Sequence, residues 1–515
     1  MYAPPRPPRS QQSCHTIVRM TRKQFLSIGA APLLSRLSFA QPGGRPKNVL
    51  LLMSDQHQPH ALGVDGNPYA RTPNLDALAR SAVRFDSAYC SNPVCVPSRA
   101  SLLTGLYTHN HGALNNATPW PFDKKTIAHH LNHAGYMTGL IGKMHYVDAQ
   151  TQGFDYRLDF NDWYQYLGPK TKLYAEELSR ANSGSGMPQI DDLWRDAGDP
   201  WKGVRELDDR EGFVHVGQVS KIQEQDHFES FVARESVRFL KNHGRKQPFF
   251  LISSFLKPHD PFMPVERFAT VYQPEDMKLP DTFGKVDLST VPQEVADSIR
   301  NNGPSPETRD PAAARLRIAM YYANLAQMDD CLGKVLTALR ELDLEKDTIV
   351  LYTSDHGEML GEHGLWQKFM FYEPSVGVPM IMHVPGLTAS DARSKTPVSQ
   401  VQVLPTLLEL CNVPVPSGLD GESLVQDLRQ PGRTSDTTVY SEFNVANNRA
   451  KCMIRRGDFK YNYYKSDTPE LYDLKRDPKE MRNLANSAEH RGKLEELKAQ
   501  LFAWHRPASR TQIQY

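Results

Sequence analysis

Short apolar runs alternate with helical patterns along most of this chain, and this alternation restricts the fold more than any other feature of the sequence. Each apolar run has the length and the Val, Ile and Leu content of a strand that is buried on both faces. The runs cover residues 49–53, 138–141, 249–255, 348–352 and 378–384. Helical patterns lie between them, at residues 72–81, 127–134 and 321–340. The alternation predicts an α/β fold in which a large, mostly parallel sheet is sandwiched by helices.

The sequence pattern changes near residues 40 and 430, which divides the chain into three parts, residues 1–40, 41–430 and 431–515. Residues 41–430 hold the strands and helices above, together with an irregular insertion at residues 150–230. After residue 430 the pattern becomes one of short alternating strands, followed by a helix near residues 489–504. Residues 431–515 therefore predict a smaller C-terminal α+β subdomain. The aromatic residues of the insertion fit two interpretations equally well, a platform that stacks on a sugar or a small core of the insertion; they are Tyr156, Trp163, Tyr164, Tyr166, Trp194 and Trp201.

Residues 1–40 are expected to be an N-terminal extension with an export signal. From Met20 the sequence has a basic pair, Arg22-Lys23, then a moderately apolar stretch, and it ends in the small-x-small pattern Ser38-Phe39-Ala40. This order is typical of an export signal, so we expect a periplasmic or extracellular protein. The basic pair resembles a twin-arginine signal with lysine in place of the second arginine, which leaves that route and ordinary secretion open. Pro32 disfavours the alternative, an N-terminal helix of the fold.

The balance of charges excludes two classes of partner. Sixty Lys and Arg against 59 Asp and Glu give a net charge of +1, so no general attraction to nucleic acid or to an anionic membrane is expected. No apolar run reaches the length of a membrane span. Six cysteines are too few for a disulfide scaffold. Cys90, Cys331, Cys411 and Cys452 are expected to be buried small side chains, and a bridge between two of them stays open.

Polar residues follow four of the predicted strands, at the point where each strand ends. They are Asp55, Gln56 and His57; Lys143 and His145; Lys257, His259 and Asp260; and Asp355, His356 and Glu358. In open α/β sheets the ligand crevice lies outside the carboxyl ends of the strands. Any one cluster could be an ordinary polar loop, but the agreement of four predicts that they meet at one site.

A further candidate is Cys95, in the segment Cys95-Val96-Pro97-Ser98-Arg99. Pro97 suits the first turn of a helix, so Cys95 is expected just before a helix N-terminus, where backbone N–H groups favour anions. Arg99, in that first turn, can offer a planar pair of donors to an oxyanion. By themselves these residues leave two interpretations open, a reactive cysteine beside an anion site and a buried cysteine ahead of a helix.

The segment at residues 95–105 resembles the sulfatase signature C-x-P-S-R-x-x-x-L-T-G, in which the cysteine is oxidised to formylglycine. Other segments resemble sulfatase motifs in the same order along the chain; they are residues 48–55, 72–76, 142–145, 257–261, 354–358, 364–373 and 471–484. The resemblance covers residues from about 47 to 505. It implies an alkaline phosphatase-like fold, an enzyme that hydrolyses sulfate esters, and a formylglycine-generating enzyme as the maturation partner.

The resemblance also implies a divalent metal, held by Asp55, Gln56, Asp355, His356 and the oxidised Cys95. Carboxylate, amide and hydroxyl oxygens favour a hard ion, and we expect Ca²⁺. The imidazole leaves Mn²⁺ open. Gln56 and His356 depart from the usual sulfatase ligand set and resemble the variant of choline sulfatases and phosphonate monoester hydrolases.

The cationic residues of the implied site would neutralise the negative charge that spreads over sulfate during hydrolysis. Arg99, Lys143 and Lys368 are expected to hold the sulfate oxygens. Lys257 is expected to line the side of the leaving group.

Two histidines complete the implied site. His259 is expected to protonate the leaving oxygen, and His145 to assist the release of sulfate. The expected substrate is a sulfate monoester on a carbohydrate; a phosphonate monoester or phosphodiester hydrolase and a choline sulfatase are the alternatives from the same superfamily. From other classes, a binding protein with a decayed site conflicts with the full set of polar groups, and a two-zinc phosphatase needs more Asp and His ligands than this chain offers.

Overall fold

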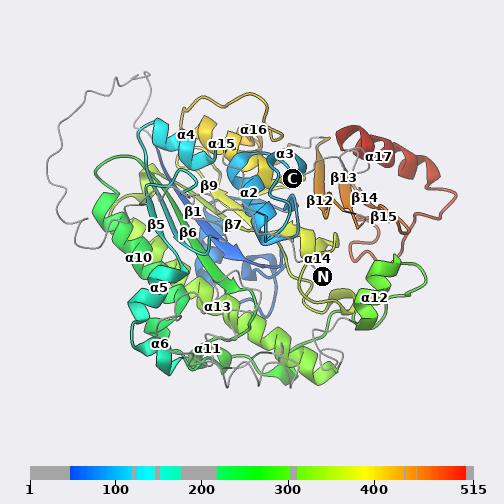
Figure 1. Ribbon diagram of the computed structural model, residues 1–515, viewed down its shortest axis with the longest axis horizontal. Helices are drawn as coiled ribbons and strands as arrows, with labels where there is room; N and C mark the ends of the chain where they lie inside the picture. Colours follow the sequence, from blue (N-terminus) through cyan, green and yellow to red (C-terminus); the bar gives the residue numbers. More distant parts are fainter. Residues whose placement is uncertain are drawn as a thin grey trace, which may run out of the picture. The chain divides into compact units, whose positions relative to one another are not determined.

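The computed structural model describes residues 47–118, 123–144, 151–174, 217, 219–301, 310–433, 436–447 and 449–505. Strand β1 (Asn48–Asp55) lies inside an eight-stranded sheet, between β7 (Thr348–Ser354) and β6 (Phe249–Pro258) (Figure 1). The strand order is β10-β2-β9-β7-β1-β6-β4-β5. The bounds of the other strands are Met137–Gly142 for β4, Tyr156–Leu158 for β5, Met380–His383 for β9, Val83–Phe85 for β2 and Ala392–Ser394 for β10.

The sheet is mostly parallel, as the sequence predicts. Strand β1 pairs in parallel with both β6 and β7, and β4 pairs in parallel with β6 and β5. Strand β9 is the exception, because it runs antiparallel to β7 and β2. The apolar run at residues 378–384 is also not one strand: Pro379, which lacks an N–H, separates β9 from β8 (Gly377–Val378). Strand β8 instead joins β3 (Ala88–Tyr89) and β11 (Val398–Ser399) in a three-stranded sheet.

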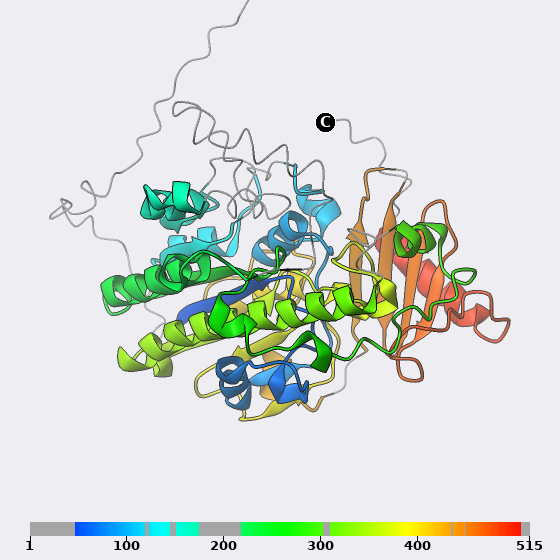
Figure 2. The same cartoon turned by 90° about the horizontal axis from the view of Figure 1, so that it is seen from below.

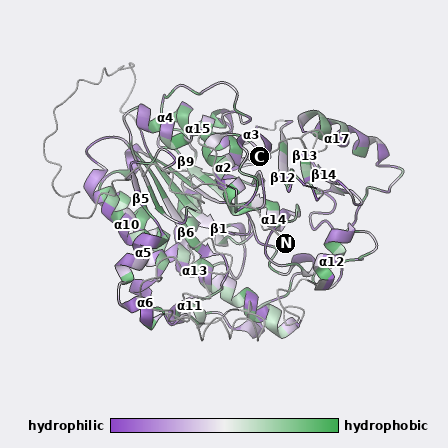
Figure 3. Cartoon of the chain, viewed as in Figure 1, coloured by the Kyte–Doolittle hydropathy of each residue, from purple (hydrophilic) through white to green (hydrophobic). Residues whose placement is uncertain are grey.

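Helices cover both faces of the large sheet (Figures 1 and 2). Leu50 and Leu52 of β1 pack in one apolar cluster with α1 (Pro73–Arg80), α10 (Phe228–His243) and α13 (Pro311–Glu341). The alternate residues of β1, such as Leu51, pack in a second cluster with α2 (Cys95–Thr104), α4 (Ile127–His133) and α15 (Val403–Leu410). Figure 3 shows apolar residues along the sheet and hydrophilic residues on the outer helix α6 (Lys170–Leu173). Burial on both faces explains why these strands are continuous apolar runs.

The long helix α13 begins ten residues before the helical pattern predicted from residue 321. Pro311 is its first residue, and the side chain of Asp310 accepts a hydrogen bond from the N–H of Ala313 at 3.1 Å. A proline at the first position and an aspartate cap are a common helix start. Other short helices of the described residues are α3 (Thr108–His111), α5 (Phe160–Leu167), α11 (Glu266–Ala269), α12 (Gln293–Asn301), α14 (Glu373–Val376) and α16 (Val425–Arg429).

The described part of the insertion belongs to the main core. Trp163 and Tyr164 of α5 are buried in the same cluster as α10 and α13, and Trp163 Nε1 donates to the carbonyl of Asp226 at 2.7 Å. These two side chains therefore pack in the protein core and do not form a platform that stacks on a sugar. Tyr166 is 43% exposed and lies under the guanidinium of Arg234. Trp194 and Trp201 lie outside the described residues.

The C-terminal segment forms the predicted α+β arrangement. Strands β12 (Thr438–Phe443), β13 (Lys451–Arg456), β14 (Phe459–Tyr464) and β15 (Glu470–Asp473) make an antiparallel sheet. Helix α17 (Arg491–Trp504) packs on it through a separate apolar cluster. The fold class is confirmed, whereas the domain boundary at residue 430 stays a prediction.

The cysteines of the described part are Cys90, Cys95, Cys331, Cys411 and Cys452, and all are buried and outside any disulfide. Pairing between them is therefore not seen. Within the described residues, no helix combines the length and the apolar character that crossing a membrane requires. The predicted export signal at residues 20–40 lies outside the described residues.

Candidate active site

The four polar clusters come from four strands that are neighbours in the sheet, in the order β7-β1-β6-β4. Since these strands are parallel, their carboxyl ends lie at one edge. Asp55 is the last residue of β1, and Asp355 directly follows β7. Lys143 follows β4, and His259 follows β6. The predicted convergence is confirmed for these residues, whereas His145 lies outside the described part of the chain.

Cys95 lies beside these strand ends, as the first residue of α2. Its side chain is 0% exposed. The Sγ atom lies 3.2 Å from His356 Nε2, 3.6 Å from Lys368 Nζ and 3.8 Å from Lys143 Nζ. A thiol between two ammonium groups and an imidazole is not an ordinary core cysteine, so the structure favours the reactive interpretation.

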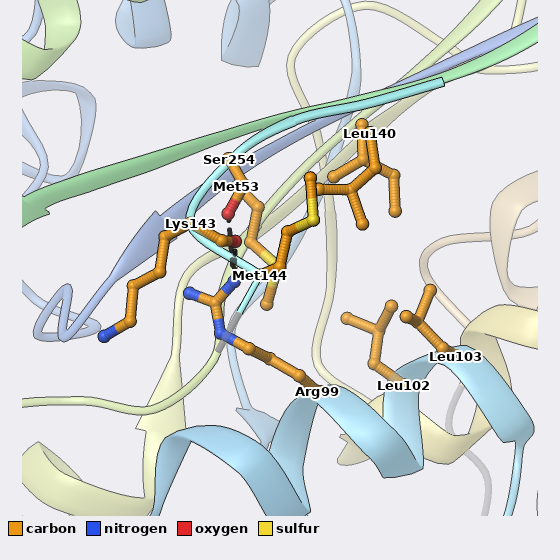
Figure 4. Close-up of a pocket in the computed structure, with 9 residues that line it drawn as sticks. Met53, Arg99, Leu102, Leu103, Leu140, Lys143, Met144 and Ser254 are labelled. Carbon is orange, nitrogen blue, oxygen red and sulfur yellow. Dashed lines mark hydrogen bonds between the residues drawn. The ribbon is translucent and has the colours of Figure 1, made fainter. Parts of the chain in front are cut away.

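Arg99 joins the two acidic strand ends. Its Nε donates to Asp355 Oδ2 and its Nη2 donates to Asp55 Oδ2, both at 2.9 Å. Nη1 donates to the carbonyl of Lys143 and to Ser254 Oγ, also at 2.9 Å (Figure 4). In this arrangement the guanidinium holds the carboxylates in place, and its predicted contact with sulfate stays a prediction.

A small cavity lies beside Arg99 (Figure 4). It is lined mostly by apolar side chains, including Leu102, Leu140 and Ile252, and its volume is about 10 Å³. That volume is about the size of one water molecule, so this cavity is not a substrate pocket. In Figure 4 the ammonium of Lys143 points away from it.

The two aspartates differ in their pKa. Burial would raise the pKa of Asp55, but the charges of Lys143, His259 and Arg99 outweigh it and hold this pKa far below its usual value. Burial raises the pKa of Asp355, and the negative charge of Asp55 adds to this rise. A positive charge beside these groups is therefore favourable.

The acidic cluster fits a divalent metal ion. One ligand atom each from Asp55, Cys95, Asp355 and His356 lie within 4.8 Å of one another. Asp55 Oδ1 is buried and accepts no hydrogen bond from any residue that the structure describes. His356 Nδ1 bonds to the carbonyl of Gly357, so that Nε2 faces Asp355 Oδ1 at 3.7 Å and Asp55 Oδ1 at 3.9 Å. An unsatisfied carboxylate oxygen beside two further oxygen and nitrogen donors suits a cation.

Lys368 and His259 form the other half of the site. Lys368 Nζ lies 2.8 Å from His259 Nε2 and donates to Gln56 Oε1, also at 2.8 Å. His259 Nδ1 contacts the carbonyl of Asp260, which fixes the ring. Lys368 therefore links the thiol, the imidazole and the amide.

Lys257 points elsewhere in this structure. Its ammonium donates to the carbonyl of Met263 at 2.8 Å and to Asn324 Oδ1 at 2.7 Å. Its predicted contact with substrate stays a prediction. His109 hydrogen-bonds to Glu442, and His111 hydrogen-bonds to Ser101 Oγ. Both histidines therefore hold α3 in place.

Two carboxylates received no role from the sequence, although both follow predicted strands. Asp260 Oδ1 and Glu358 Oε2 both accept hydrogen bonds from Gln56 Nε2. Their spacing after the strands was the available signal, but which group each would contact depends on the tertiary structure.

Comparisons with known proteins agree with this arrangement. A family model described as Sulfatase matches residues 47–413, and one described as N-sulphoglucosamine sulphohydrolase, C-terminal, matches residues 361–506. An arylsulfatase of Clostridium perfringens is 30% identical over 472 residues, which cover 88% of this chain and 92% of that protein. A choline-sulfatase of Rhizobium meliloti is 31% identical over 86% of this chain and 83% of that protein. An N-acetylglucosamine-6-O-sulfatase of Bacteroides thetaiotaomicron is 27% identical over 92% of this chain and 88% of that protein.

Solved structures show the same fold. The phosphonate monoester hydrolase of Agrobacterium radiobacter superposes with a TM-score of 0.73 at 24% identity, over 89% of this chain and 95% of that chain. A protein in complex with its substrate D-glucosamine-2-N,6-O-disulfate superposes with a TM-score of 0.69 at 23% identity, over 91% of this chain and 99% of that chain.

The fold and the matched relatives define a hydrolase of the alkaline phosphatase superfamily. Within it, the chain belongs to the sulfatase family, because the family model covers most of its length and the relatives match over most of theirs. It is therefore an enzyme that hydrolyses sulfuric esters.

Proposed function

We propose that the protein is exported and removes sulfate from carbohydrates, with Cys95 converted to formylglycine and a divalent metal at the acidic cluster. The observation that carries the proposal is the environment of Cys95. A fully buried thiol lies within 3.8 Å of two ammonium groups and 3.2 Å from His356 Nε2. Such a site suits a nucleophile that attacks an anionic group.

The metal would be held by Asp55, Gln56, Asp355, His356 and the modified side chain at position 95. When bound, it supplies a positive charge that lowers the pKa of a coordinated hydroxyl and stabilises sulfate oxygens. We propose Ca²⁺, with Mn²⁺ as the alternative because of the imidazole ligand. Arg99 pairs with both aspartates and so fixes the positions of these two proposed metal ligands.

The formylglycine hydrate supplies two hydroxyl groups, one that attacks sulfur and one whose deprotonation expels sulfate and regenerates the aldehyde. Lys143 and Lys368 neutralise charge on the sulfate oxygens, since both ammonium groups face position 95. His259 gives its proton to the leaving alcohol oxygen as the S–O bond breaks. His145 takes the proton from the second hydroxyl, and Lys257 lines the leaving-group side.

A carbohydrate substrate is supported by the names of relatives. They include an N-acetylglucosamine-6-O-sulfatase and an ulvan-active sulfatase of Formosa agariphila, the latter 27% identical over 88% of this chain and 80% of that protein. The choline-sulfatase at 31% identity, together with Gln56 and His356, supports choline sulfate as the second candidate.

A substrate panel tests the assignment. The values of kcat/KM for sulfated monosaccharides, choline sulfate, an aryl sulfate and a phosphonate monoester compare transition-state binding directly. We expect the highest value for a sulfated sugar. A higher value for choline sulfate would keep the reaction and replace the substrate, and a higher value for the phosphonate would overturn the proposal.

Mass spectrometry of the tryptic peptide that ends at Arg99 tests the modification. We expect an aldehyde at position 95 that reacts with a hydrazide probe when the protein is produced with a formylglycine-generating enzyme. A fully active preparation that holds only unmodified Cys95 would refute the mechanism.

The N-terminus of the protein from its native host tests the export. Cleavage after Ala40 and recovery from the periplasm or the medium are expected. An uncleaved chain in the cytosol would refute this part.

A further inference from the structure

The carboxylate of Glu358 joins three segments of the active site. This side chain is 0% exposed and lies three residues after Asp355. Its Oε1 accepts hydrogen bonds from the backbone N–H of Gln367 at 2.6 Å and of Leu360 at 3.0 Å. Its Oε2 accepts from Gln56 Nε2. Because Gln367 directly precedes Lys368, one carboxylate holds both Gln56 and the segment that carries this lysine.

The backbone around Glu358 is in a conformation that needs such support. Gln56, Leu360 and Gln367 have positive φ angles of 63°, 46° and 64°. Non-glycine residues rarely adopt this region, and the surroundings must stabilise it. Each of the three residues donates a hydrogen bond to Glu358. Glu358 therefore holds the backbone N–H groups of two of these residues, Leu360 and Gln367, and holds Gln56 through its side-chain amide.

The contacts of Gln56 fix the orientation of its amide. Its Nε2 faces two carboxylates, Glu358 Oε2 and Asp260 Oδ1, the latter at 3.3 Å. Its Oε1 accepts from Lys368 Nζ at 2.8 Å. A carboxylate only accepts hydrogen bonds, so the NH₂ end must turn toward Glu358 and the oxygen must turn the other way. The oxygen is the end that can bind a cation.

We propose that Glu358 is a positioning residue that turns the amide oxygen of Gln56 toward the metal and couples it to Lys368. The inference rests on the metal site of the proposed function. It assigns to Glu358 the orientation of a ligand, and not contact with the substrate. Groups that orient metal ligands in this way contribute about 10- to 100-fold to metal affinity.

The substitution Glu358→Gln tests the orientation with little change of shape. The new amide keeps its oxygen on the N–H groups of Leu360 and Gln367 and presents its NH₂ to the NH₂ of Gln56. The two NH₂ groups repel each other, so the amide of Gln56 loses its main support and must move from the orientation in which its oxygen can bind the metal. We expect Ca²⁺ and Mn²⁺ to bind about 10- to 100-fold more weakly, measured by calorimetric titration of chelator-stripped protein.

The substitution Gln56→Glu makes the opposite test. A carboxylate ligand normally tightens the binding of a cation, because it adds charge. Here one of its oxygens would face Glu358 and Asp260, so we expect both ions to bind more weakly than in the wild type. The double variant Gln56→Glu/Glu358→Gln restores a donor opposite the new carboxylate and should bind tighter than either single variant.

The control is Glu470→Gln. Glu470, in the C-terminal sheet, is also 0% exposed and accepts hydrogen bonds from Tyr372, Tyr464 and Tyr472. This variant should lower the unfolding midpoint and leave the metal affinity unchanged.

The role of Glu358 is overturned if Glu358→Gln binds both ions like the wild type, or if the double variant binds no tighter than the single variants. If Glu358→Gln does not fold, the comparison of Gln56→Glu with the double variant decides. A wild-type protein that binds neither ion would overturn the metal site and the inference together, which is a different result.

Discussion

The ammonium of Lys143 and the carboxylate of Asp55 form an ion pair of 2.6 Å in which both side chains are 0% exposed. Lys143 directly follows strand β4, and Asp55 is the last residue of strand β1. Strand β6 lies between these two strands in the sheet. The ion pair therefore spans the carboxyl end of β6. Removal of one partner of a buried pair leaves the other charge uncompensated, at a cost of about 3–5 kcal/mol.

Lys143→Met should lower kcat about 100- to 1000-fold, because one of the cations beside position 95 is lost. The free energy of unfolding of the metal-free protein should fall by about 3–5 kcal/mol. Affinity for Ca²⁺ should not fall, since Asp55 loses a competing cation. The control is Lys451→Met: Lys451 is equally buried and pairs with Glu294 at 2.6 Å, and this variant should lose stability but keep kcat. An unchanged kcat for Lys143→Met would refute the proposed role of Lys143 in neutralising charge on the sulfate oxygens.

Cys95→Ser should fold normally and accumulate one covalently bound sulfate per molecule. A serine hydroxyl can attack sulfur, but the ester that it forms lacks the second hydroxyl that expels sulfate. Intact-mass spectrometry after incubation with substrate measures the adduct. Cys90→Ser, at another buried cysteine, should turn over without an adduct. Sustained turnover by Cys95→Ser would contradict the two-hydroxyl mechanism.

Exhaustive chelation should abolish activity, and Ca²⁺ or Mn²⁺ should restore it. Asp55→Asn and Asp355→Asn each remove a charge from the cluster and should weaken metal affinity at least about tenfold. Asp86→Asn, at a residue that pairs with Arg393 away from the cluster, should bind metal like the wild type. Full activity in a protein with no measurable metal would rule the ion out.

Glu229→Gln tests a buried ion pair behind the site. Burial opposes ionisation of Glu229, but His227 and Lys257 outweigh it and lower its pKa from 4.5 to about 2. This lowered pKa stabilises the fold fully above pH 4.5, and the contribution is lost as the pH falls toward 2. At pH 6 the variant should be less stable by about 3 kcal/mol, following about 1.4 kcal/mol per pKa unit.

Urea unfolding at a series of pH values measures this difference. The gap between Glu229→Gln and the wild type in the free energy of unfolding should be fully present from pH 4.5 to 6 and should narrow as the pH falls below 4.5. Glu266→Gln, at an exposed glutamate, should leave the stability unchanged. A gap that widens in acid would contradict the assignment.

Much of the central sheet could be predicted from the sequence because its strands are buried on both faces. Burial on both faces makes a strand a continuous apolar run, and a polar residue then marks its end. The position of Asp55 and Asp355 at strand ends follows from this rule. The direction of β9 does not, because an apolar run carries no information on whether its neighbour is parallel.

Contacts between side chains were the part of the site that the sequence could not predict. The contact of Arg99 with sulfate stays a prediction, and the bonds of its guanidinium with Asp55 and Asp355 do not follow from the sequence pattern. Both outcomes are compatible with one position on α2. Glu358 was visible as a polar residue after β7, but its bond with Gln56 joins residues that are 302 positions apart.

The burial of Cys95 affects when its thiol can be oxidised during synthesis of the chain. Its neighbour Lys368 is 273 residues further along the chain, so the side chains that enclose the thiol are made long after it. At roughly 5–20 residues per second, ribosomes need about 14–55 s for that stretch. Throughout this interval the thiol is accessible to a maturation enzyme without any opening of the fold. The rate of translation between residues 95 and 368 therefore sets the time for the proposed oxidation, and slower synthesis should raise the fraction of protein that is converted.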